Sequence, residues 1–202
     1  MIRTIFLDFG KVLAWFDHEL AVTRLLAHCD LSPQQLHNVL YEIERYNALE
    51  GGQIDAQEYL RQVRELVRFS CADELFFQHF ADIFTPIDEM CSLVPKLARR
   101  HRLVLASNTN EIHSRKFLID FERTLAHFQH LVLSHQAKAI KPQADFYTYC
   151  QQFAHCKPGE CLFIDDRADN TAAAIEHGWN AIQFENVEQL LPALRRFAVY
   201  NE

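Results

Sequence analysis

Five short apolar segments recur along the 202 residues of the chain, and each is followed by polar or turn residues. They are residues 3–8 (RTIFLD), 102–106 (RLVLA), 130–134 (HLVLS), 161–165 (CLFID) and 180–184 (NAIQF). Segments this short and this apolar are typical of buried strands, and helical patterns separate most of them. The alternation predicts an α/β fold of the doubly wound, Rossmann-like kind, with a mostly parallel sheet covered on both faces.

The interval from residue 15 to residue 90 departs from this alternation, because it contains several helix starts and no convincing strand. Ser32 and Gln35 form a capping box, with Pro33 at the first helical position. Asp55 and Glu58 form a similar box just after a glycine pair. We therefore predict an α/β core domain from residues 1–14 and 91–202, and an all-helical cap domain from residues 15–90.

Composition and charge exclude several classes of protein. Hydrophobic residues make up 49% of the chain, which is enough for an ordinary core. The net charge is −7 and no cluster of Lys and Arg occurs, so we expect no nucleic-acid partner. We also expect no membrane partner, because no apolar run approaches the length of a span or of a secretory leader. The six cysteines lack C-x-x-C spacing, so we expect free thiols and a cytoplasmic location.

Chemically active residues stand where the predicted strands end. In an open parallel sheet, ligands bind beyond the carboxyl ends of the strands, so these residues should meet at one edge. They are Asp8 after the first strand, Ser107 and Asn108 after the second, Lys141 beyond the third, and Asp165 and Asp166 at the fourth.

This set of residue types suits phosphoryl transfer. Carboxylates from two strands form an oxygen site of the kind that Mg²⁺ prefers. A serine and a lysine can hold phosphate oxygens by hydrogen bonding and charge. An aspartate can attack phosphorus to form an acyl phosphate, while the metal and the lysine neutralise charge on the transferring group.

Four motifs, IFLDFGKVL, LASNTN, IKP and FIDDRADN, occur in this order and resemble those of the haloacid dehalogenase (HAD) superfamily. The resemblance is strongest to its subfamily IA sugar-phosphate phosphatases of the α-D-glucose-1-phosphate type, and it spans nearly the whole chain. It implies a Mg²⁺-dependent phosphatase that acts on a small phosphorylated metabolite, such as a sugar phosphate. It also implies an aspartyl-phosphate intermediate and a cap that closes over the substrate.

The resemblance also implies a metal site. Asp8 would be both the nucleophile and a ligand of Mg²⁺, and Gly10 would offer its backbone carbonyl. Asp166 would be the second carboxylate ligand, and Asp165 would bind the metal directly or through water.

The same resemblance implies a phosphoryl-binding group. Ser107 and Asn108 would bind the phosphoryl oxygens, and Lys141 would pair with both the nucleophile and the phosphate. Ser107 could also cap the helix that follows it. Asn170 stands where many relatives have another acid.

Gly10 marks a departure from most phosphatases of the superfamily, which have an acid–base aspartate at this position. Such a group contributes roughly 10²–10⁴-fold in rate. Lys11 could donate a proton if desolvation lowered its pKa, but it also reads as a surface lysine. Asp17 is a second candidate acid, although its position favours a helix cap.

Two other functions compete with the phosphatase. A pseudo-enzyme that binds without turnover would explain Gly10, but it gives no reason to retain Asp8, Ser107, Lys141 and Asp166 together. A 2-haloacid dehalogenase would need no metal and usually has a tyrosine at the position of Gly10, so the paired acids disfavour it.

Overall fold

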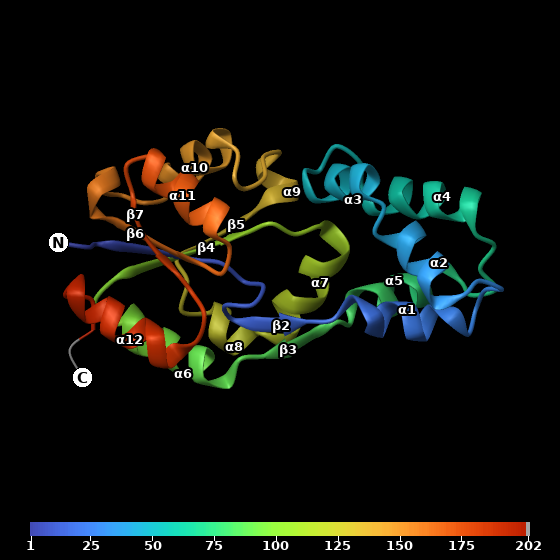
Figure 1. The fold of residues 1–202 in the computed structure, drawn as a ribbon, viewed down its shortest axis with the longest axis horizontal. Coiled ribbons are helices and arrows are strands. Elements are labelled where there is room, and N and C mark those ends of the chain that lie inside the picture. The colour runs from blue at the N-terminus through green and yellow to red at the C-terminus, as the bar shows by residue number, and fades with distance from the viewer. Residues whose placement is uncertain (201–202) are drawn as a thin grey trace.

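The computed structural model describes residues 1–200 and divides them into a sheet-based lobe and a helical lobe (Figure 1). The sheet-based lobe contains a parallel sheet of five strands in the order β5-β4-β1-β6-β7. These strands are β1 (Thr4–Leu7), β4 (Arg102–Ser107), β5 (His130–Leu133), β6 (Cys161–Asp165) and β7 (Asn180–Gln183). Each lies on one of the predicted apolar segments, so the predicted α/β fold class is confirmed.

Helices cover both faces of this sheet (Figure 1). One face carries α6 (Asp88–Ala98), α7 (Glu111–Asp120), α8 (Glu122–Leu125) and α12 (Val187–Arg196). The other carries α9 (Ser134–Ala137), α10 (Ala144–Gln151) and α11 (Ala168–Glu176), and the 3-10 turn η1 (Pro158–Glu160) precedes β6. Along β1, Ile5 and Leu7 pack into the first layer and Phe6 into the second. Burial on both faces explains why the strands are apolar throughout rather than alternating.

The helical lobe has an apolar core of its own. It consists of α1 (His18–Leu26), α2 (Pro33–Leu40), α3 (Ile43–Glu50), α4 (Ala56–Leu66) and α5 (Asp73–Ala81). Tyr59, Phe76 and Phe80 are fully buried at its centre. The predicted capping box at Ser32 is present, and the Asp55 side chain accepts from the Glu58 N–H. We call this lobe the cap; its boundaries at residues 15 and 90 stay a prediction.

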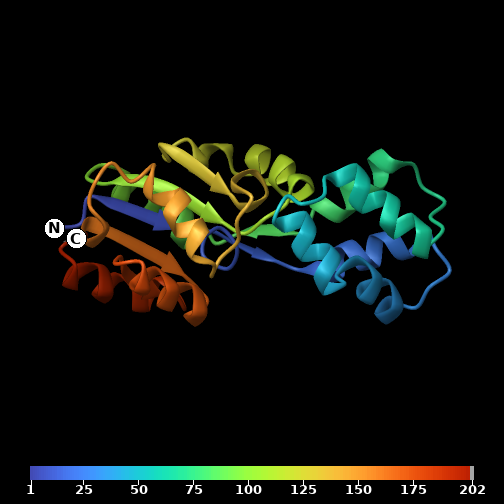
Figure 2. The same ribbon diagram turned by 90° about the horizontal axis from the view of Figure 1, so that it is seen from above.

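A short ribbon connects the two lobes, and it was missing from the sequence-based prediction of residues 15–90 (Figure 2). Strands β2 (Ala14–Phe16) and β3 (Phe84–Pro86) pair antiparallel, with Trp15 opposite Thr85. Three residues are too few to show a strand period, and the two partners lie at opposite ends of the cap sequence. The expectation of no strand in this interval was therefore wrong at its two ends.

No helix within residues 1–200 has both the length and the apolar character needed to cross a bilayer. All six cysteines are free thiols.

Candidate active site

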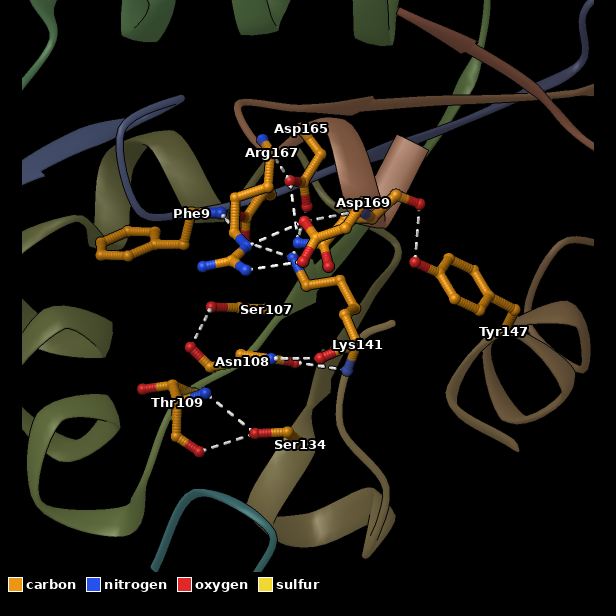
Figure 3. A network of polar contacts seen from close by, with 12 residues as sticks. Phe9, Ser107, Asn108, Thr109, Ser134, Lys141, Tyr147, Asp165, Arg167 and Asp169 are labelled. Carbon is orange, nitrogen blue, oxygen red and sulfur yellow. Dashed lines mark hydrogen bonds and ion pairs between the residues drawn. The ribbon is translucent and has the colours of Figure 1, made fainter. Parts of the chain in front are cut away.

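Lys141 lies at the centre of the residues that the sequence placed at the strand ends (Figure 3). Its Nζ is 2.8 Å from Asp8 Oδ1 and 2.7 Å from Asp165 Oδ2, and all three residues are buried. Strands β1 and β6 are neighbours in register, and the Asp8 N–H donates to the Ile164 carbonyl at 2.9 Å. The parallel pairing therefore brings the two carboxylates within reach of the same lysine.

The Asp165 carboxylate is held by three hydrogen bonds, one from Lys141, one from the loop after β6 and one from α11. The Arg167 N–H and the Asn170 side-chain amide each donate to Asp165 Oδ1 at 2.9 Å. Tyr147 in turn donates its hydroxyl to the Asn170 carbonyl at 2.7 Å. Asn170 therefore orients Asp165, whereas another carboxylate at this position would repel it.

The carboxylates form a cluster that fits a divalent cation. Asp8, Asp165 and Asp166 each place one carboxylate oxygen so that all three lie within 4.8 Å of one another. Within residues 1–200, Lys141 is the one cation in ion-pair contact with this cluster. One lysine leaves an excess of negative charge, and an all-oxygen donor set of this kind suits Mg²⁺.

Burial and neighbouring charges shift the pKa values of the residues in this cluster. Burial raises the pKa of Asp8 to about 7, although Lys141 opposes the rise. Burial and the neighbouring Asp165 also raise the pKa of Asp166. Burial by itself would lower the pKa of Lys141, but Asp165 and Asp8 together hold it above its ordinary value. The lysine thus stays charged, and a second cation would favour the ionised carboxylates.

Ser107 ends β4 and Asn108 follows it, and the two approach Lys141 from the other side (Figure 3). The Asn108 side chain accepts from the Lys141 N–H at 2.8 Å and donates to the Lys141 carbonyl at 3.0 Å. This pair of bonds fixes the loop that carries the lysine. Asn110, not Ser107, caps α7, so the helix-cap alternative for Ser107 is wrong.

Two cavities meet at this edge of the sheet. The acidic cavity, of about 490 Å³, is lined by Asp8, Lys141, Asp166 and Arg167, among others. The aromatic cavity, of about 180 Å³, extends from Ser107 toward the cap between Phe9, Phe84, His18 and Tyr46. The residues that line both cavities are Gly10, Phe16, Glu50 and Asn108.

Known proteins share this arrangement of sheet and cap. A D-ribitol-5-phosphate phosphatase of Bacteroides thetaiotaomicron is 26% identical over 196 residues, which cover 92% of this chain and 93% of that protein. A predicted HAD-like hydrolase of Porphyromonas gingivalis superposes over the full length of both chains, with a TM-score of 0.81 at 24% identity. The chain thus has the fold of HAD family enzymes and resembles one phosphatase in sequence over nearly its whole length. No protein-family model matches it.

A second solved structure bears on the metal site of HAD enzymes. A HAD family enzyme of Bacteroides thetaiotaomicron, crystallised with magnesium and inorganic phosphate, superposes with a TM-score of 0.74 at 22% identity. The superposition covers 94% of this chain and 99% of that one.

Gly10 is the position at which this chain departs from most phosphatases of the HAD superfamily, and the Phe16 side chain fills the space beside it. A Cβ atom built on Gly10 would lie 3.0 Å from Cε1 of the Phe16 ring. Lys11 is exposed, with its Nζ 5.6 Å from the centre of the same ring. Asp17 caps α1 by accepting from the Glu19 N–H at 2.9 Å, which confirms the helix-cap interpretation. Asp17 lines neither cavity.

Sequence reasoning missed the residues that dock the cap on the core. The buried Ser134 hydroxyl accepts from the Thr109 N–H at 2.8 Å, and its proton lies between the Glu50 carbonyl at 2.7 Å and the Thr109 carbonyl at 2.9 Å. Lys138 also donates to the Gly52 carbonyl. The glycines after Glu50 indicated only a chain break in the sequence, and no local pattern connects them to Ser134.

We expect Ser134→Ala to lower the free energy of unfolding by about 1–3 kcal/mol, because the buried Thr109 N–H loses its acceptor. Urea unfolding at neutral pH measures this difference. Ser92→Ala, at an exposed position of α6, is the matched control and should change stability by less than about 0.5 kcal/mol. Equal stability of the two variants would mean that the hydroxyl does not dock the cap.

His113 predicts an acid sensitivity of the interface between cap and core. Its Nδ1 is 3.1 Å from the Asn110 amide and its Nε2 is 3.2 Å from the Phe80 carbonyl, and burial lowers its pKa to about 3. The unfolded chain binds the proton first, below pH 6.5, so stability should be lost as pH falls from 6.5 toward 3. At pH 5 this loss amounts to about 2 kcal/mol.

The measurement is urea unfolding at pH 7 and pH 5. His113→Gln should lose less stability between these pH values than the wild type does. His127→Gln, at a half-buried histidine, should lose as much as the wild type. Parallel losses in all three proteins would contradict the role of His113.

Proposed function

We propose that this chain is a Mg²⁺-dependent phosphatase that hydrolyses a small phosphomonoester through an aspartyl-phosphate intermediate. The observation that carries the proposal is the buried Lys141, bridged between Asp8 and Asp165 at a cavity that also holds Asp166. The phosphatase activity of the D-ribitol-5-phosphate relative supports it.

In the proposed mechanism, a carboxylate oxygen of Asp8 attacks phosphorus. The Asp8–phosphorus bond forms as the bond from phosphorus to the alcohol oxygen breaks, and the alcohol leaves with a proton. Water then attacks the same phosphorus, which frees Asp8 and releases inorganic phosphate. Lys141 keeps Asp8 oriented and offsets negative charge on the phosphoryl oxygens.

The remaining site residues would hold the phosphoryl group and the metal. We propose that the Ser107 hydroxyl and the Asn108 backbone N–H bind phosphoryl oxygens, because the Asn108 side chain is engaged with Lys141. Asp8, Asp166 and the Gly10 carbonyl would hold Mg²⁺, with Asp165 acting through water because three donors already surround it. Bound Mg²⁺ would supply charge neutralisation at the phosphoryl oxygens.

The leaving group would lie in the aromatic cavity, whose volume of about 180 Å³ suits a small alcohol such as a sugar or a polyol. His18 and Tyr46 offer polar atoms among aromatic walls there. This placement makes the cap the part of the chain that selects the substrate. The cytoplasmic location stays a prediction.

Metal dependence is the direct test of this function. We expect phosphate release from a panel of sugar, polyol and nucleoside monophosphates with Mg²⁺, its loss with EDTA, and its return when Mg²⁺ is added in excess. Release that continues at the same rate in EDTA would contradict the metal-dependent mechanism. Mg²⁺ binding in calorimetry without release from any ester would instead support the pseudo-enzyme.

A further inference from the structure

The proposed phosphatase needs a proton donor for the leaving oxygen, and position 10 does not supply one. Gly10 has no side chain, and the Phe16 ring stands 3.0 Å from where a Cβ atom would be. A donor must therefore reach the junction of the two cavities from another element. Asp17 is turned into a helix cap and lines neither cavity, so it does not fill this role.

Glu50 stands at that junction. Among the described residues that line the aromatic cavity, it alone carries a carboxyl group. It also lines the acidic cavity beside Asp8 and Lys141, together with Gly10. A residue that lines both cavities can present its carboxyl group to the space between the nucleophile and the proposed leaving group, which is where a general acid has to be.

The cap holds Glu50 in this place through its main chain. Glu50 is the last residue of α3, and its carbonyl lies 2.7 Å from the buried Ser134 hydroxyl of the core. Lys138 of the core binds the Gly52 carbonyl just beyond it. These contacts leave the Glu50 carboxyl free of the docking role, because the backbone performs it.

We propose that Glu50 is the general acid–base residue of this enzyme, replacing the aspartate that is absent at Gly10. The inference rests on the proposed phosphatase function. As the bond from phosphorus to the alcohol oxygen breaks, the Glu50 carboxylic acid gives its proton to that oxygen. The resulting carboxylate then takes a proton from the water that attacks the aspartyl phosphate, which restores the acid for the next cycle.

Protonation of the neighbouring groups agrees with this assignment. Burial raises the pKa of Glu50 to about 7, and Lys141 limits the rise, so both forms are populated near neutral pH. His18, another titratable residue of the aromatic cavity, has its pKa lowered to about 4 by burial and by His37. It is neutral at pH 7 and does not supply a proton readily. Burial raises the pKa of Tyr46 well above its ordinary value, which makes its hydroxyl a poor proton donor.

A comparison of two leaving groups tests the proposal. Nitrophenolate leaves without a proton, whereas the alkoxide of a polyol needs one. We expect Glu50→Gln to lower kcat/KM for ribitol 5-phosphate by about 10²–10⁴-fold and to leave kcat/KM for p-nitrophenyl phosphate nearly unchanged. This parameter covers the steps up to the aspartyl phosphate, so a role of Glu50 in the second step does not obscure the comparison.

Control variants separate catalysis from structure. Glu44→Gln, at an exposed position of the same helix, should match the wild type on both esters. An equal loss on both esters in Glu50→Gln would assign Glu50 a structural role and overturn the proposal, as would no loss on either. Asp8→Asn should be inactive on both esters. If the wild type also released no phosphate from either ester, the phosphatase function itself would fail, and the inference would fail with it.

Discussion

Asp8→Asn should reduce phosphate release by roughly 10⁴-fold or more, because the amide cannot form the covalent intermediate that the mechanism requires. The substitution keeps the size of the side chain. Lys141 stays paired with Asp165 at 2.7 Å, so the variant should fold. Steady-state phosphate release at saturating Mg²⁺, with urea unfolding in parallel, measures both effects.

Asp17→Asn is the matched control for this variant. Asp17 lies close in sequence and caps α1, and asparagine caps helices as well as aspartate does, so stability should be preserved. Its activity should match the wild type. A large loss of activity in Asp17→Asn would revive Asp17 as the acid. Retention of activity in a folded Asp8→Asn protein would rule out Asp8 as the nucleophile.

Lys141→Met should lower the free energy of unfolding by about 3–5 kcal/mol at neutral pH, the largest stability effect that we expect in this protein. Methionine has a similar length but no charge, so Asp8 and Asp165 would remain buried without a cation. Phosphate release should be lost as well, because the lysine orients the nucleophile. Urea unfolding of the metal-free protein gives the energy directly.

A double variant isolates the electrostatic part of this effect. Lys141→Met combined with Asp165→Asn removes one of the two unpaired carboxylates, so it should be more stable than Lys141→Met alone. Lys96→Met, at an exposed lysine of α6, should change stability by less than about 0.5 kcal/mol. Equal losses in the single and double variants would show that the lysine contributes packing rather than charge.

The core of the fold could be predicted from the sequence because its strands are buried on both faces. A segment such as CLFID reads as a strand without any knowledge of its neighbours, and all five residues of β6 are buried. The centre of the site could be predicted from the same apolar segments, because Asp8 and Asp165 stand at the ends of adjacent parallel strands. That Lys141 would lie near these two carboxylates could be predicted from the rule that ligands bind at one edge of such a sheet.

The parts that escaped prediction depend on contacts between residues far apart in the chain. The contact of Ser134 with the Glu50 carbonyl helps to place Glu50 at the site, and neither residue carries a local signal of that contact. Phe16, the last residue of β2, occupies the space beside Gly10, and β2 is too short to detect from sequence. A sequence pattern indicates which residues are buried and whether they repeat with the period of a helix or a strand. The positions of Glu50 and Phe16 depend instead on how the cap is docked on the core.

The ribbon of β2 and β3 has a consequence for how new specificities could arise in this chain. The chain leaves the core and returns to it along two paired strands, so the ends of the inserted segment are hydrogen-bonded neighbours. A different set of helices could be grafted onto these two strands without disturbing the parallel sheet. If Glu50 supplies the proton, however, such a graft would exchange part of the reactive chemistry together with the pocket. Recombination of the insert would then alter turnover and substrate choice in a single event.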